Sequence, residues 1–132
     1  FGIPFAGAAA DLVVNVFAPI VPGELARVVK PGGHLILAVP GERHLYGLKE
    51  ILYEHPYENP YKETEYPGFT FLQRTAVARE ITITDPQTML NLFAMTPYYW
   101  KTGVEGGENL RQTQRLETHI EFHFLVYQRN LT

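Results

Sequence analysis

Cysteine is absent from this sequence, so neither a disulfide nor a thiolate metal site can form within it. Long hydrophobic runs are absent too: no apolar stretch approaches the ~20 residues that a helix needs to cross a bilayer, and no signal peptide is recognisable. An excess of positive charge is also lacking. The formal net charge is −3, which argues against a large nucleic-acid surface of the chain's own. We therefore expect a cytoplasmic globular protein without a membrane partner.

The 132 residues alternate between strand-like and helix-like segments, and their number suits one domain with a single core. Asp11–Phe17 and His34–Val39 are apolar on both faces, which is typical of strands buried between helices. A helix over 23–30 is predicted to end at the turn Pro31-Gly32-Gly33, and a second helix over 43–53 is predicted to bury Leu45, Leu48 and Leu52. A loop over 55–68 and a strand over 69–84 should follow, and then a helix from Asp85-Pro86 to Pro97 whose core-facing residues are Met89, Leu92, Phe93 and Ala94. A glycine-rich loop over 103–107 and a helical turn at 108–115 complete the predicted elements before the last strand.

The last predicted strand has the cleanest alternation. Ile120, Phe122, Phe124 and Val126 alternate with His119, Glu121, His123 and Leu125, so we expect the first set to be buried and the second to be partly wet. The order β-α-β-α-β-α-β predicts an α/β layered sheet with right-handed crossovers. Because the last strand differs from the first two, we expect it to be antiparallel and near the edge of the sheet.

Several segments resemble those of known enzymes. Residues 25–33 (LARVVKPGG), followed by an apolar strand, resemble the segment of class I methyltransferases that joins the helix after the fourth strand to the fifth strand. A narrower family, the large-subunit ribosomal RNA guanine-N1-methyltransferases, is similar across essentially all of the chain. The segments that carry this resemblance are Pro4-Phe5, Phe17-Ala18-Pro19, residues 40–45 (PGERHL), residues 68–70 (GFT) and residues 95–100 (MTPYYW).

This resemblance implies a fold and an activity. Residues 1–132 would be the C-terminal half of a doubly wound, Rossmann-like methyltransferase sheet, contributing strands four to seven with the last strand antiparallel. A zinc module for RNA and the Gly-rich cofactor loop would precede the chain, which we therefore interpret as an excised piece that is inactive alone. The full-length protein is expected to transfer a methyl group from S-adenosylmethionine to N1 of a guanine in ribosomal RNA.

The same resemblance assigns the candidate site residues. It places a cofactor-contacting histidine at His44, just past the end of the second strand, and puts Pro4-Phe5 beside the adenine ring. Phe17 and Pro19 follow the end of the first strand and are predicted to line the methyl-transfer pocket, with Arg43 close to it. No carboxylate stands out as the base that removes the guanine N1 proton, so the catalytic residue is unassigned.

Other side chains have alternative interpretations. Four tyrosines after the second helix could stack on an unpaired base or pack on the domain surface, and we favour packing, as we do for Trp100. In a strand His119 and His123 lie about 13 Å apart, too far to chelate one ion, so we expect no metal site. Six scattered arginines are interpreted as surface charges. The tyrosines are Tyr53, Tyr57, Tyr61 and Tyr66, and the arginines are Arg27, Arg43, Arg74, Arg79, Arg111 and Arg115.

Two other functions remain open, a class I methyltransferase that acts on a small molecule and a non-enzymatic α/β interaction module. The strand at 11–17 would also expose an apolar edge if its neighbour is missing. We therefore expect this edge to support self-association into a homodimer.

Overall fold

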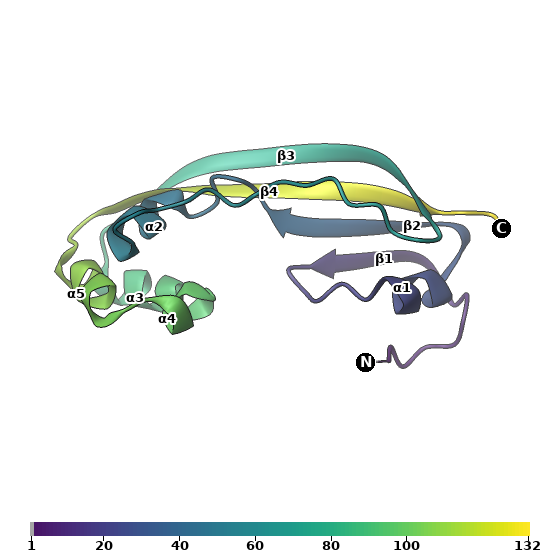
Figure 1. Cartoon of the computed structure of the whole chain (residues 1–132), viewed down its shortest axis with the longest axis horizontal. Helices are drawn as coiled ribbons and strands as arrows, with labels where there is room; N and C mark the ends of the chain where they lie inside the picture. The colour runs from purple at the N-terminus through teal and green to yellow at the C-terminus, as the bar shows by residue number, and fades with distance from the viewer. Residues whose placement is uncertain (1) are drawn as a thin grey trace. The chain divides into compact units, whose positions relative to one another are not determined.

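A computed structural model describes residues 2–132 of the chain. In this part of the chain four strands and five helices follow one another (Figure 1). In chain order they are β1 (Ala10–Val16), α1 (Pro22–Val28), β2 (Val29–Pro40), α2 (Tyr46–Leu52), β3 (Phe69–Ile83), α3 (Pro86–Met95), α4 (Tyr98–Lys101), α5 (Val104–Gln112) and β4 (Leu116–Arg129). No helix among the described residues has the length and apolar character needed to cross a membrane.

The strands form one mixed sheet in the order β1-β2-β4-β3. β1 and β2 are parallel, with Val13 opposite Leu35 and Val16 opposite Ala38, and α1 connects them (Figure 1). β4 pairs antiparallel with β2. The predicted α/β class and the antiparallel last strand are therefore confirmed. β4 lies between β2 and β3, so the edge strand on this side of the sheet is β3 and not the last strand. The predicted burial holds for β2, where Leu35, Leu37 and Ala38 are buried, and is wrong for β1, where Leu12, Val14 and Val16 are each more than half exposed.

The chain contains two compact units, each with its own hydrophobic cluster, instead of the single expected core. Unit 1 comprises residues up to 41, 61–77 and 122–132. Its cluster consists of Leu25, Val28, Val29, Leu35, Leu37, Phe69, Leu125 and Tyr127. Unit 2 comprises residues 42–60 and 78–121. Its cluster consists of Leu45, Leu48, Leu52, Met89, Phe93, Tyr98, Leu110 and Leu116.

Several local predictions are confirmed. α3 begins at the Asp85-Pro86 signal, where a side-chain oxygen of Asp85 accepts a hydrogen bond from the backbone N–H of Thr88 at 2.9 Å. β3 covers 69–83, and the segment before it has no helix or strand, as expected of the 55–68 loop. The predicted leucine stripe of α2 is buried.

The predicted start of the second helix is wrong. α2 begins at Tyr46 and not at about Arg43, because Leu45 adopts a left-handed backbone with φ of 56°. Its N–H donates to the carbonyl of His119 at 2.8 Å, so a bond to β4 replaces the first helical turn. α5 is likewise longer than expected: Gly106 and Gly107 lie within it and not in a loop.

The ends of the second strand also differ from the prediction. β2 begins at Val29, directly after α1, and the Pro-Gly-Gly segment forms an irregularity within it. The partner of Ala10 is Val29, whereas that of Leu12 is His34. A Cβ at Gly33 would lie 2.8 Å from the carbonyl oxygen of Asp11, so the close approach of these two strands requires glycine there.

The prediction for the faces of the last strand is wrong. His123, Leu125 and Tyr127 are buried, whereas Phe124 is 37% exposed. The reason is tertiary: the hydrophobic cluster of unit 1 forms on the Leu125 face, and the ring of Tyr61 packs against His123 at 5.3 Å. Ala94 and Trp100, which we expected to pack, are exposed.

Candidate functional site

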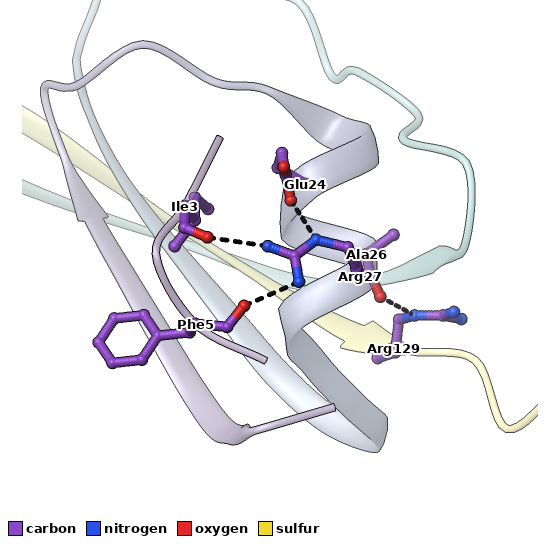
Figure 2. A network of polar contacts seen from close by, with 6 residues as sticks. All are labelled: Ile3, Phe5, Glu24, Ala26, Arg27 and Arg129. Carbon is purple, nitrogen blue, oxygen red and sulfur yellow. Dashed lines mark hydrogen bonds and ion pairs between the residues drawn. The ribbon is translucent and has the colours of Figure 1, made fainter. Parts of the chain in front are cut away.

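The segment before β1 carries the predicted adenine-contacting residues and is held by α1. The guanidinium of Arg27 donates to the carbonyl oxygens of Ile3, at 2.9 Å, and Phe5, at 2.8 Å, and it forms an ion pair with Glu24 (Figure 2). The backbone carbonyl of Arg27 also accepts from the N–H of Ala8 at 2.8 Å. Arg27, interpreted from the sequence as a surface charge, therefore anchors this segment.

An apolar pocket of about 350 Å³ lies between this segment, β1 and α1. Phe5 lines it, and the ring of Phe5 is 66% exposed. A flat aromatic ring on an apolar wall is a chemically suitable contact for a purine. Pro4 is adjacent to Phe5 and is exposed. The residues that line the pocket are Ile3, Phe5, Ala9, Ala10, Leu12, Val13 and Val28.

At its carboxyl end β1 leads into a sharp turn that hydrogen bonds stabilise. Phe17 has a left-handed backbone with φ of 51°, and its N–H donates to the carbonyl of Ala38 in β2 at 3.1 Å. The side chain of Asn15 bridges the turn: it donates to the carbonyl of Pro19 and accepts from the N–H of Ala18. The ring of Phe17 is exposed and lies 5.5 Å from that of Phe122. Phe17 and Pro19 are thus both presented at the strand end, where open α/β sheets place ligands.

In unit 2 the backbone of β4 fixes His44. Its Nδ1 accepts a hydrogen bond from the N–H of Glu121 at 3.1 Å. A ring nitrogen that accepts carries no proton, so neutral His44 has its proton on Nε2. Burial lowers the pKa of His44, the charge of Glu121 raises it and that of Lys49 lowers it, with a net decrease. His44 is therefore a neutral Nε2–H donor at pH 7.

Arg43, the neighbour of His44, is held by the same glutamate. Its backbone N–H donates to the Glu121 carboxylate at 3.3 Å, and its guanidinium lies 3.9 Å from the centre of the Tyr46 ring. The stacked guanidinium keeps its charge and its hydrogen-bond donors. It can therefore contact an anionic or carbonyl group of a ligand.

Lys49 is a buried charge that no sequence pattern singled out. Its ammonium donates to the carbonyl of Tyr57 at 3.1 Å and to the side-chain oxygen of Asn59 at 2.8 Å. The rings of Tyr57 and Tyr98 lie 4.3 and 5.3 Å away. Burial lowers the pKa of Lys49. The lysine thus fixes the loop after α2, and only tertiary contacts identify it.

The four loop tyrosines take part in packing. Tyr53 stacks on Tyr57 at 5.9 Å and contacts Tyr98 edge-on at 6.2 Å in unit 2. Tyr61 and Tyr66 pack against the cluster of unit 1. These contacts agree with the packing interpretation that we favoured.

Two further features bear on ligand chemistry. A hollow of about 850 Å³ in unit 1 contains no predicted site residue, and Glu63 and Glu65 on its wall would repel a phosphate. His119 pairs with Glu80 at 3.3 Å. Within residues 2–132 no group of three acidic or histidine side chains could hold a metal ion.

The structure thus distributes the predicted residues over two units. Pro4, Phe5, Phe17 and Pro19 lie in unit 1, and Arg43 and His44 lie in unit 2. Their roles in binding stay predictions.

Comparison with known proteins gives the following relatives. No protein-family model matches the chain. The 23S rRNA (guanine(748)-N(1))-methyltransferase of Streptomyces fradiae is 40% identical over 50 residues, which are 38% of this chain and 18% of that protein. A provisionally assigned 23S rRNA guanine-N1-methyltransferase of Bacillus subtilis is 24% identical over 127 residues, which are 93% of this chain and 45% of that protein.

The fold has a counterpart among solved structures. The crystal structure of a provisionally assigned methyltransferase from Bacillus halodurans matches with a TM-score of 0.51 and 16% identity, over 97% of this chain and 68% of that one. The chain spans less than half of the length of either curated relative. Sequence and fold together show that this chain is a methyltransferase-related α/β polypeptide.

Proposed function

We propose that this chain is part of an S-adenosylmethionine-dependent methyltransferase that modifies N1 of a guanine in large-subunit ribosomal RNA, in the cytoplasm. The observation that carries the proposal is the similarity over 127 residues to a provisionally assigned guanine-N1-methyltransferase, in a chain whose sheet has the order β1-β2-β4-β3 with β4 antiparallel to β2. The zinc module and the Gly-rich loop that the family resemblance implies would belong to the rest of the protein, and so would most contacts with RNA phosphates.

The residues present fit parts of the cofactor. The apolar pocket lined by Phe5 suits the adenine ring, and Pro4 would extend the wall beside it. His44 suits a polar group of the cofactor, because its neutral imidazole donates from Nε2. The bound cofactor would supply the methyl group on its sulfonium centre.

The contribution of the chain to the reaction is mainly orientation. Methyl transfer is an in-line displacement, so its rate depends on how well donor and acceptor are held. Phe17 and Pro19 at the end of β1 are proposed to border the acceptor base. Arg43 is proposed as a hydrogen-bond donor to the RNA substrate. The guanine N1 proton has to leave before or during attack. The base that takes this proton is not assigned to any residue of the chain.

The test uses the full-length protein of which this chain is proposed to be a part. S-adenosylmethionine is titrated calorimetrically, and ribosomal RNA is treated with protein and cofactor and analysed for N1-methylguanine by mass spectrometry. We expect cofactor binding and one methylated guanine. His44→Ala should weaken cofactor binding about 10-fold, as expected for the loss of one hydrogen bond within a polar site. His55→Ala, at a histidine whose side chain is 91% exposed, should leave binding unchanged.

Two other outcomes would each indicate a different function for this protein. Absence of cofactor uptake by the full-length protein would exclude an enzyme of this class and favour an interaction module. If the full-length protein binds the cofactor but methylates only a small molecule, the proposed RNA substrate is wrong. The isolated chain should bind the cofactor negligibly.

Self-association through β1 is a second proposal. β1 is at the edge of the sheet, and the side chains of Leu12, Val14 and Val16 are each more than half exposed. An apolar edge strand is a template for pairing with another chain. Sedimentation velocity of the isolated chain should show a concentration-dependent dimer, and Val14→Lys should convert it to a monomer. A wild-type monomer with β1 amides protected from exchange would contradict this.

A further inference from the structure

The segment before β1 needs an external anchor to keep a defined position. Residues 2–9 form no helix or strand, and all of them except Ile3 are exposed. A segment with so little burial has little hydrophobic stabilisation of its own. Ile3 packs against the cluster of unit 1. The exposed residues around it depend on specific polar contacts for a defined position.

Arg27 supplies these contacts from a fixed base. Leu25 and Val28, on either side of it in α1, are buried in the cluster of unit 1, so the helix itself is held by the core. From this helix the two terminal nitrogens of the guanidinium reach the carbonyls of Ile3 and Phe5, and its Nε reaches Glu24 (Figure 2). Glu24 thereby fixes the plane of the guanidinium. The two carbonyls that the guanidinium binds belong to the residues on either side of Pro4.

This geometry uses properties that are special to arginine. The guanidinium is planar and presents several donors in a rigid fork, whereas the ammonium of lysine is a point charge on a flexible stem. Hydrogen bonds from a charged donor are stronger than those between neutral groups, although solvent weakens them. Arg27 makes two of them to the same short segment.

We propose that Arg27 is a positioning residue for the cofactor: it holds the backbone of Ile3–Phe5 so that the ring of Phe5 faces the apolar pocket beside β1. This inference rests on the proposed function, which places the adenine ring in that pocket. Arg27 does not contact the cofactor. It acts through Phe5, since the carbonyl that it binds belongs to the residue whose ring lines the pocket.

Arg129 provides a matched comparison within unit 1. Its guanidinium donates to the carbonyl of Ala26 at 2.9 Å (Figure 2). It also donates to the carbonyl of Gly68 at 3.3 Å. It therefore braces the opposite side of the same helix and has no contact with residues 2–9 in any described hydrogen bond. A substitution of Arg129 therefore tests whether loosening of α1 alone affects residues 2–9, because the hydrogen bonds of Arg27 are kept.

The experiment has a structural readout and a functional readout. In the isolated chain, hydrogen exchange followed by NMR should show the Phe5 amide exchanging at least 10-fold faster in Arg27→Met than in wild type. Arg27→Lys should give an intermediate rate, and Arg129→Met should leave the Phe5 rate unchanged. In the full-length protein, Arg27→Met should raise the dissociation constant of S-adenosylmethionine about 10-fold and leave kcat at saturating cofactor within 2-fold.

The outcomes separate this inference from the proposed function. An unchanged Phe5 rate in Arg27→Met would overturn the anchoring role, whatever the protein binds. Faster exchange with an unchanged cofactor dissociation constant would overturn the link to the cofactor while the proposed function stands. If wild-type full-length protein takes up no cofactor, the proposed function fails, and the cofactor role of Arg27 fails with it. If Arg27→Met does not fold, the Arg27→Lys comparison decides by the same criteria.

Discussion

Replacing Gly47 with alanine is expected to destabilise unit 2, although alanine is the better helix former. A Cβ at this position would overlap the carbonyl oxygen of Glu117 and would lie 2.8 Å from the Cα of Thr118. Both are backbone atoms of β4, so no side chain can turn away. The N–H of Gly47 also donates to the hydroxyl of Thr118 at 3.0 Å, and this bond would be lost when α2 moves off the strand.

The expected loss of stability is on the order of 3 kcal/mol, the upper part of the range for overpacking. The helix-propensity gain of about 1 kcal/mol for Gly→Ala is too small to offset it. The measurement is urea unfolding followed by circular dichroism. An unfolding midpoint equal to that of wild type would show that α2 is not in backbone contact with β4.

Two adjacent glycines in α5 supply the control for this prediction. A Cβ at Gly106 would overlap the carbonyl oxygen of Leu52 and lie 2.6 Å from the side chain of Thr102, whereas a Cβ at Gly107 would meet nothing within 4 Å. Gly107→Ala should therefore stabilise the chain by about 0.5–1 kcal/mol. Gly106→Ala should destabilise it. The contrast between neighbours in one helix separates packing from propensity.

Replacing Lys49 with alanine is expected to have the second-largest effect, a loss of about 2–4 kcal/mol, as for truncation of other long buried side chains. The side chain is fully buried, so its apolar stem fills space as a methionine would. Its ammonium also satisfies the carbonyl of Tyr57 and the side chain of Asn59, which would lose their donor. Urea unfolding of the Lys49→Ala variant measures the combined loss of stability from packing and hydrogen bonding.

Lys49→Met separates the stem from the charge. Methionine keeps most of the buried volume, so this variant should recover most of the stability lost in Lys49→Ala. Both variants should raise the pKa of His44, because they remove the charge of Lys49, which lowers it, while burial and the raising charge of Glu121 remain. An NMR titration of His44 measures this shift. An unchanged pKa in a folded Lys49→Met variant would show that the two groups do not interact.

Local sequence determined those parts of the fold that depend on neighbours in the chain. The Asp85-Pro86 pair started α3 as predicted, because an N-cap acceptor and a proline act within one helical turn. The two-sided apolar segments became β1 and β2, and the resemblance in residues 25–33 placed a crossover helix between parallel strands. The candidate residues at the strand ends follow from the same pattern, since open α/β sheets place ligands there.

Tertiary structure decided which faces, glycines and charges matter. Alternation in the last strand distinguished its two faces, but the position of the unit 1 cluster buried Leu125 and left Phe124 exposed. Propensity treats Gly47 as a weak point of a helix, whereas its role comes from the backbone of a strand about 70 residues away. Arg27 and Lys49 resemble ordinary surface cations in sequence, because the acceptors that give them roles are carbonyl and amide groups of distant or irregular segments. Residue type and spacing carry no record of such contacts, which exist only after the chain has folded.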